Sequence, residues 1–117
     1  MEDALESLGV WRRSRDLAIE IYRNLASCKD RGFKDQITRA AVSVPSNIAE
    51  GFERNSHREF VQFLKIAKGS CAEVRTQIYI GKEIGFLGQP AADQLTHESL
   101  ELSKMLQGLI RRYKSAH

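Results

Sequence analysis

The sequence contains few of the residues that mark secreted, membrane-bound or metal-binding proteins. Only two of its 117 residues are cysteine, Cys28 and Cys71, and they form no C-x-x-C motif. We expect both to be free thiols, as in a reducing compartment. The N-terminus, Met1-Glu2-Asp3, is acidic and no long apolar run follows it, so the sequence predicts neither a signal peptide nor a membrane span. The expected location is therefore the cytoplasm.

Motifs of common enzymes and cofactor sites are also absent. A di-iron helical bundle needs Glu-x-x-His on two helices, and no Glu in this chain is followed three residues later by His. There is no glycine-rich phosphate loop, and neither cysteine has a histidine at a suggestive spacing. His57, His97 and His117 stand at a helix start, in a polar part of a helix and at the C-terminus, which favours surface positions over ligation. We expect no catalytic residues, no cofactor and no metal.

Neither sign of charge dominates. Eighteen Lys and Arg against fifteen Asp and Glu give a net charge of +3, which permits contact with a polyanion without requiring it. The apolar share is 42%, an ordinary value for a globular protein. At this length the chain is expected to form a single domain over residues 1–117.

Helical periodicity dominates the chain, and no stretch alternates as a strand does. Apolar residues recur every three to four positions in four segments. The predicted helices span about 11–27, 34–54, 57–84 and 90–114, with a lead-in or docking turn at 1–9 and a tail at 115–117. Four helices joined by three short connections predict an all-α, antiparallel up-down-up-down four-helix bundle.

Local signals set the helix ends. Ser56 and Glu59 have the spacing of a capping box and predict the start of the third helix. Gly85 is the expected residue just past its end, and Pro90 suits the first turn of the fourth. Asp35 is placed to stabilise the start of the second helix. Small residues around Gly69, in the middle of the third helix, predict close approach of a neighbouring backbone or a partner.

The second helix contains Pro45. Proline removes a backbone hydrogen bond, and its ring clashes with the carbonyl of Ala41, at a cost of about 3 kcal/mol in an isolated helix. A kink between Ala41 and Pro45 is therefore expected. The alternative is two helices broken at Val44. Because the apolar and polar lines keep their phase across the proline, the sequence favours one kinked helix.

A polar line runs beside the apolar stripe of this helix, at a spacing of i, i+4, i+8 and i+11. Its members are Arg39, Ser43, Asn47 and Glu50. One interpretation is a ligand or nucleotide site. The favoured one is an interhelical network, in which Arg39 and Glu50 pair with groups such as Glu73 and Asn47 satisfies backbone exposed by the proline. Buried charges need such partners, and we expect the network to specify the fold or the oligomer.

Three segments carry motifs of a known family: Q-I-T-R-A-A-V-S-V-P-S-N-I-A-E-G at 36–51, R-N-S-H-R-E-F at 54–60 and F-L-K-I-A-K-G-S-C-A-E at 63–73. With Trp11 and Ile21-Tyr22 upstream, they resemble the four-helix-bundle proteins encoded within intervening sequences of bacterial 23S ribosomal RNA genes. The family usually has a second arginine where Thr38 stands and isoleucine where Val44 stands.

This resemblance implies a four-helix protomer that assembles as a homopentamer without established catalytic activity. The chain also resembles a relative of the same fold, the accessory variability determinant protein of diversity-generating retroelements, which looks like a basic pentamer that binds nucleic acid and a reverse transcriptase. The resemblance thus directs attention to basic surfaces and to self-association, although a shared fold does not settle function.

Two basic clusters are the candidate contacts for RNA or DNA. They lie on the first helix and at the end of the fourth: Arg12, Arg13 and Arg15, and Arg111, Arg112 and Lys114. The predicted topology brings these ends close together, so we expect one patch that a pentamer repeats around a ring, giving strongly salt-dependent binding. The alternatives are a solvated face that binds nothing and a scaffold for an unidentified protein partner.

Overall fold

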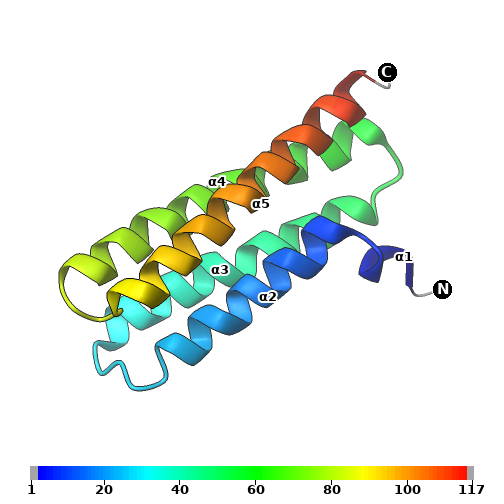
Figure 1. The fold of residues 1–117 in the computed structure, drawn as a ribbon. Coiled ribbons are helices and arrows are strands. Elements are labelled where there is room, and N and C mark those ends of the chain that lie inside the picture. Colours follow the sequence, from blue (N-terminus) through cyan, green and yellow to red (C-terminus); the bar gives the residue numbers. More distant parts are fainter. Residues whose placement is uncertain (1–2, 116–117) are drawn as a thin grey trace.

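The computed structural model describes residues 3–115, which form five helices and, within that range, no strand. They are α1 (Asp3–Glu6), α2 (Gly9–Asn24), α3 (Arg31–Phe52), α4 (His57–Glu83) and α5 (Gln89–Ser115). Figure 1 shows α2 to α5 as a bundle in which consecutive helices run in opposite directions, with α1 as a single turn beside the start of α2. The predicted all-α four-helix bundle is confirmed.

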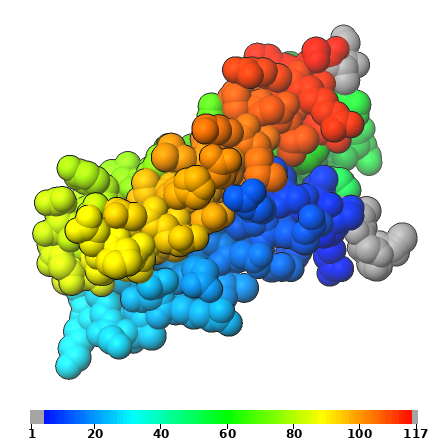
Figure 2. All heavy atoms as spheres, viewed as in Figure 1, coloured from blue at the N-terminus to red at the C-terminus, as the bar shows by residue number. Residues whose placement is uncertain are grey.

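The bundle is elongated, with extents of 46 × 25 × 21 Å. Each of the four long helices packs against two neighbours: α2 and α4 both contact α3 and α5. The space-filling view shows α5, in yellow to red, lying between α4 and α2 with its outer surface open to solvent (Figure 2). The long helix α5 therefore borders two different surface grooves.

Several helix ends differ from their predicted positions. The helix predicted at 11–27 spans Gly9–Asn24, since Val10 already faces the core at 4% exposure. Part of the predicted lead-in is the helical turn α1. The helix predicted to start at 34 begins at Arg31, because Asp30 caps it by accepting a 2.9 Å hydrogen bond from the Phe33 amide. Asp35 therefore lies past the first turn, and its expected role was wrong.

The ends of α4 follow the predicted signals. Ser56 Oγ accepts a 3.1 Å hydrogen bond from the Glu59 amide, which confirms that half of the capping box. Gly85 has φ of 88°, a left-handed conformation that glycine adopts without a steric penalty. The Phe86 amide then bonds the Gly81 carbonyl at 2.8 Å, closing a Schellman motif. Of the predicted tail, Ser115 belongs to α5, and residues 116–117 lie outside the described residues.

The helix α3 continues unbroken through Pro45, so the interpretation as two helices was wrong. The carbonyl that loses its partner to the proline is that of Ala41. The side-chain amide of Asn47 donates to the Ser43 carbonyl at 2.8 Å and not to the Ala41 carbonyl. Contrary to the expectation, it therefore does not replace the hydrogen bond that Ala41 loses. The kink itself stays a prediction.

The predicted apolar stripes meet along the bundle axis. The largest side chains that are almost fully buried come from the four long helices and from Leu25, the residue just past α2. They are Ile21, Leu25, Ile37, Ile48, Leu64, Ile78, Leu102 and Leu106. Two buried serines are satisfied within their own helices, since Ser14 donates to the Trp11 carbonyl and Ser99 to the Thr96 carbonyl. The core thus contains polar groups without unpaired hydroxyls at these positions.

Close backbone packing occurs at other glycines than the one predicted. A Cβ added at Gly81 would lie 2.7 Å from Phe33 Cζ, and one at Gly51 would lie 2.6 Å from Phe63 Cβ. A Cβ added at Gly69 would meet nothing within 4 Å. Within the protomer the expectation for Gly69 was therefore wrong, and Gly69 instead keeps a stretch of the surface free of side chain.

Candidate nucleic-acid interface

The polar line of α3 splits into a contacting pair, Ser43 and Asn47, and two exposed charges, Arg39 and Glu50. Ser43 Oγ lies 2.9 Å from Ser70 Oγ, which joins α3 to α4, and the Asn47 amide donates to Ser43 Oγ at 3.0 Å. The hydroxyl of Ser70 is the interhelical partner that the sequence argument did not name. This cluster is a hydroxyl and amide contact between two helices.

The charged members of the same line lie in solvent. Glu50 is exposed and pairs at 3.0 Å with Arg54, which lies just past the end of α3. Arg39 and Glu73 are exposed and border one hollow between α3 and α4, but within the described residues they form no ion pair with each other. The expected role of the whole line in specifying the fold or oligomer stays a prediction.

The basic cluster on α2 is engaged within the protomer. Arg12 donates to the Glu6 carbonyl at 2.8 Å, and Arg13 pairs with Glu98 of α5 at 2.9 Å. Arg15 pairs with its neighbour Asp16 at 3.0 Å, and its guanidinium also lies 5.2 Å from the Trp11 ring centre. Each guanidinium in this cluster thus already has a partner.

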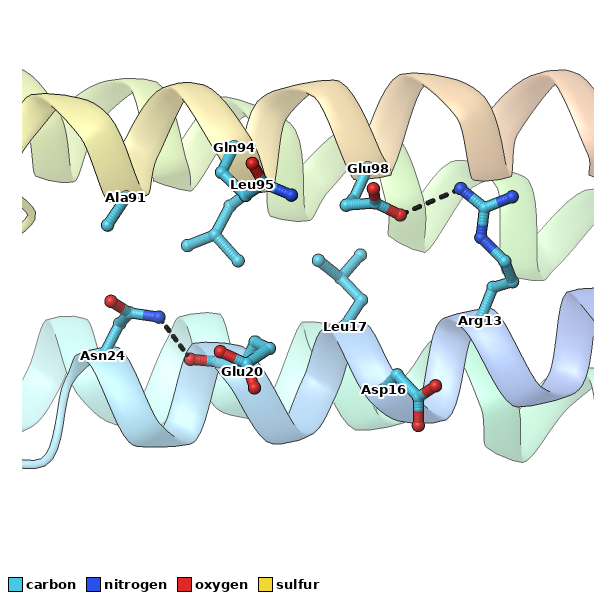
Figure 3. Close-up of a pocket in the computed structure, with 9 residues that line it drawn as sticks. All are labelled: Arg13, Asp16, Leu17, Glu20, Asn24, Ala91, Gln94, Leu95 and Glu98. Atoms are coloured by element: carbon cyan, nitrogen blue, oxygen red, sulfur yellow. Dashed lines mark hydrogen bonds and ion pairs between the residues drawn. The ribbon is translucent and has the colours of Figure 1, made fainter.

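The surface between α2 and α5 forms a groove of about 420 Å³, which we call the acidic groove. Its lining comprises Arg13, Asp16, Leu17, Glu20, Asn24, Ala91, Gln94, Leu95 and Glu98. Figure 3 shows Leu17 and Leu95 directed toward each other between the two helices, with Arg13 reaching across to Glu98. Each of the three carboxylates is ion-paired, Glu98 with Arg13, Asp16 with Arg15 and Glu20 with Arg23. The one cation of this lining, Arg13, is therefore already neutralised.

The second basic cluster, at the end of α5, lies against α4. The Tyr113 ring packs edge-on against His57 at 4.9 Å and Phe60 at 5.0 Å, both in the first turn of α4. The guanidinium of Arg112 lies 5.9 Å from the Tyr113 ring centre. Lys114 borders a groove shared with α4, whereas Arg13 borders the acidic groove. One member of each predicted cluster therefore lines a groove, and these two grooves are different.

The groove between α4 and α5 holds about 440 Å³, and we call it the basic groove. Its lining comprises Lys65, Lys68, Gly69, Ala72, Gln107, Ile110 and Lys114. Among the residues that the structure describes, three ammonium groups border it and no carboxylate does. The Lys68 ammonium donates to Gln107 Oε1 at 2.6 Å, which fixes one charge at the wall. Because Gly69 and Ala72 have little or no side chain, this part of the wall stays low.

The lysines Lys65 and Lys68 were missed by the sequence argument, which considered only clusters at helix ends. The sequence feature that could have identified them is that two lysines lie one turn apart on α4, beside its apolar stripe. The next cations of α4 follow at seven-residue intervals after Lys68 and also reach toward α5. Arg75 lies 3.4 Å from the Ser99 carbonyl, and Lys82 pairs with Asp93 at 2.9 Å, a hydrogen bond that raises the pKa of Lys82.

A thiol lies buried between the same two helices. Cys71 donates its S–H to the Ser99 carbonyl at 3.2 Å, and burial raises the pKa of this thiol although Arg75 opposes the shift. A thiol with a raised pKa stays protonated near neutral pH and is a weak nucleophile. Cys28, the other free thiol, is half-buried.

The described residues contain no other arrangement that indicates chemistry. Within residues 3–115 no group of three or more His, Cys, Asp or Glu side chains is placed to hold a metal ion. Over the same residues no helix is both long and apolar enough to cross a membrane.

The fold and its surfaces define the class of protein: it is an all-α four-helix bundle, and its surface includes a groove lined by lysines. The chain belongs to the 23S rRNA-intervening sequence protein family, which matches residues 6–108. The resemblance seen in the sequence motifs is confirmed.

A solved structure shares this fold. It is a protein of unknown function from the S23 ribosomal protein family of Bacteroides thetaiotaomicron VPI-5482. The two chains are 24% identical and superpose with a TM-score of 0.81 over 86% of this chain and 97% of the other. At this identity the likeness establishes the fold alone. Among curated proteins the sequence finds no match.

Proposed function

We propose that this protein is a non-enzymatic RNA-binding protein that works as a homo-oligomer and holds the RNA backbone in its basic groove. The observation that supports this is the groove's lining, in which Lys65, Lys68 and Lys114 meet no carboxylate. Clustered ammonium groups favour a ligand that carries a series of negative charges, and the phosphates of an RNA backbone form such a series.

The charge of one protomer is small, so repetition contributes much of the affinity. Three lysines that replace counterions on a single strand give a slope of log K against log salt of about −2. A ring of copies presents the groove several times, and linked weak contacts add up to a high overall affinity. We therefore expect binding that is tight at low salt and weak at high salt.

Fluorescence anisotropy with a labelled RNA tests this proposal. Titrations at about 50 mM and about 200 mM salt should show a fall in affinity of at least tenfold. A labelled neutral polymer of similar size serves as the control and should not bind. Absence of RNA binding at the lower salt concentration would contradict the proposal.

Self-association is supported by exposed apolar side chains on two sides of the bundle. The first apolar patch is Ile19, Tyr22 and Val42 on α2 and α3, and the second is Ile80 on α4 with Ile84 just past its end. All five side chains are at least 40% exposed. Because the patches differ and lie on different helices, a contact between one patch and the other is heterologous. Such a contact generates a ring when its rotation closes and an open filament when it does not, and we propose the ring.

The family resemblance implies five copies in that ring. Light scattering should then give a mass about five times the 13.3 kDa of one protomer. Ile80→Glu should lower this mass, because it places a charge in the second apolar patch, whereas Lys104→Glu on the exposed side of α5 should not. A wild-type monomer at micromolar concentration would contradict this part of the proposal.

The same apolar patches favour a second candidate, a scaffold that binds a protein partner. A pull-down with and without nuclease separates the two functions. A partner held through RNA is lost after nuclease treatment, whereas one bound to an apolar patch stays.

A further inference from the structure

We infer that the basic groove extends along α4 to a base-stacking platform at Tyr79, which makes single-stranded RNA its ligand. This inference rests on the proposed function and specifies which form of RNA the groove takes. It is carried by the exposure of Tyr79, by its register with the lysines and by the distribution of charge around it.

Tyr79 is the most exposed large hydrophobic side chain of α4. It is 64% exposed, more than any other large hydrophobic side chain of the described residues. Within those residues its ring stacks on no other ring and its hydroxyl forms no hydrogen bond. A tyrosine that stabilised the bundle would bury its ring, so this one contributes little to the fold. Its flat face is open to a planar partner from solvent.

The register of α4 aligns Tyr79 with the groove. Lys65, Ala72 and Tyr79 follow one another at seven-residue intervals, so they lie along one side of the helix. At a rise of 1.5 Å per residue this line is about 21 Å long. Ala72 leaves the middle of the line low, and Figure 1 shows α5 running beside α4 along this length. The line connects a cationic end to an aromatic end.

The charges around Tyr79 indicate a base rather than a phosphate at that end. Lys82, three residues on, is neutralised by Asp93 at 2.9 Å, and Glu83 is exposed one turn beyond. Arg75, one turn before, is half-buried and directed to the Ser99 carbonyl at 3.4 Å. A phosphate gains little there, whereas a nucleobase stacks on a tyrosine ring without needing a cation. At the other end Lys65, Lys68 and Lys114 receive the backbone.

Only an unpaired strand can place its phosphates at the lysines and one of its bases on the Tyr79 ring at the same time. In an RNA duplex the bases are stacked and paired inside the helix, where a surface tyrosine cannot reach their faces. A single strand lays its phosphates along the lysines and turns a base onto the aromatic ring. The groove and Tyr79 together therefore select single-stranded over double-stranded RNA.

Anisotropy with two labelled RNAs tests the inference: an unstructured single strand of about 15 nucleotides and a duplex of the same length. The wild type should bind the single strand more tightly. Tyr79→Ala should weaken single-strand binding about tenfold, the loss expected for one stacked base, and leave duplex binding nearly unchanged. Tyr79→Phe keeps the ring and should bind as the wild type does. Tyr79→Leu keeps apolar area without a ring and should bind as the alanine variant does.

The outcomes separate this inference from the proposed function. If Tyr79→Ala or Tyr79→Leu binds the single strand as tightly as the wild type, or the duplex binds better, stacking at Tyr79 is refuted while the basic groove stands. If the wild type binds neither RNA at low salt, the proposed function fails and this inference fails with it. Circular dichroism should show equal helix content in all variants, because the side chain is exposed.

Discussion

The two grooves that flank α5 have similar volumes and opposite charge. The basic groove, about 440 Å³, is bordered by three lysines and no carboxylate. The acidic groove, about 420 Å³, is bordered by Asp16, Glu20 and Glu98, which pair with arginines, and by one cation, Arg13. One helix thus separates a groove lined by lysines from a groove lined by ion-paired carboxylates. A net charge of +3 conceals this division.

The comparison shows that cations are neutralised across helices and not only along the chain. Arg13 looks like part of a basic cluster in the sequence, yet its partner Glu98 is 85 residues away. Lys65 looks isolated in the sequence, yet the fold brings it to the same groove as Lys114. Surface potential therefore depends on which helices are neighbours.

Charge reversal should produce the largest difference between the grooves. The triple variant Lys65→Glu, Lys68→Glu, Lys114→Glu should lose about 100-fold in RNA affinity, at roughly 1 kcal/mol for each lost phosphate contact. These side chains are exposed or at the groove wall, so the bundle should stay folded. Anisotropy titrations at low salt measure the change.

The matched control reverses charge beside the other groove. Arg13→Glu with Arg15→Glu removes two cations that already pair within the protomer, so RNA affinity should change less than about threefold. If this control lost as much affinity as the triple variant, the assignment of RNA to the basic groove would be wrong.

Two glycines of α4 test how open the basic groove is. Gly81→Ala should destabilise the protein by about 1–3 kcal/mol, because the new Cβ would lie 2.7 Å from Phe33 Cζ. Gly69→Ala should stabilise it by up to about 1 kcal/mol, since the site is empty and alanine favours helix. Urea unfolding measures both. Similar losses in the two variants would mean that the wall of the groove is packed.

Removing one lysine should lower the salt dependence of RNA binding by the amount expected for one phosphate contact. Lys114→Gln should reduce the slope of log K against log salt by about 0.7 for each protomer that contacts a single strand. Titration over a series of salt concentrations gives the slope. An unchanged slope would exclude Lys114 as a phosphate contact.

The smallest effect is expected in the acidic groove. Glu98→Gln removes the ion pair with Arg13, whose side chains are 41% and 35% exposed, so the free energy of unfolding should fall by less than about 1 kcal/mol. RNA affinity should stay within about twofold. A larger gain in RNA affinity would show that the acidic groove becomes a binding surface once Arg13 is released.

Much of the fold follows from sequence because its signals are local. The 3.6-residue periodicity predicted the four long helices, and Ser56 and Gly85 marked both ends of α4. The start of α3 was misplaced because Asp30 and Asp35 are both plausible first-turn residues, and only the Asp30 bond to the Phe33 amide decides between them. Close packing at Gly51 and Gly81 depends on phenylalanines from other positions in space, which no local pattern reports.

The candidate site was harder to predict because it is made by neighbouring helices. Sequence reasoning named Lys114, Arg111 and Arg112 from their position at a helix end, and of these Lys114 lines the basic groove. It missed Lys65 and Lys68, since two lysines in a long helix look like an ordinary solvated face. These lysines form part of a basic groove only because α5 packs beside α4 and brings Lys114, without a carboxylate, to the same lining.

Cross-linking maps the RNA surface most directly. The wild-type protein is irradiated with a photoreactive single-stranded RNA at low salt, digested, and the modified peptides are identified by mass spectrometry. We predict cross-links on α4 and the end of α5, at peptides containing Lys65, Lys68, Tyr79 or Lys114. Cross-links concentrated on α2, around Arg13 and Arg15, would contradict the assignment of RNA binding to the basic groove.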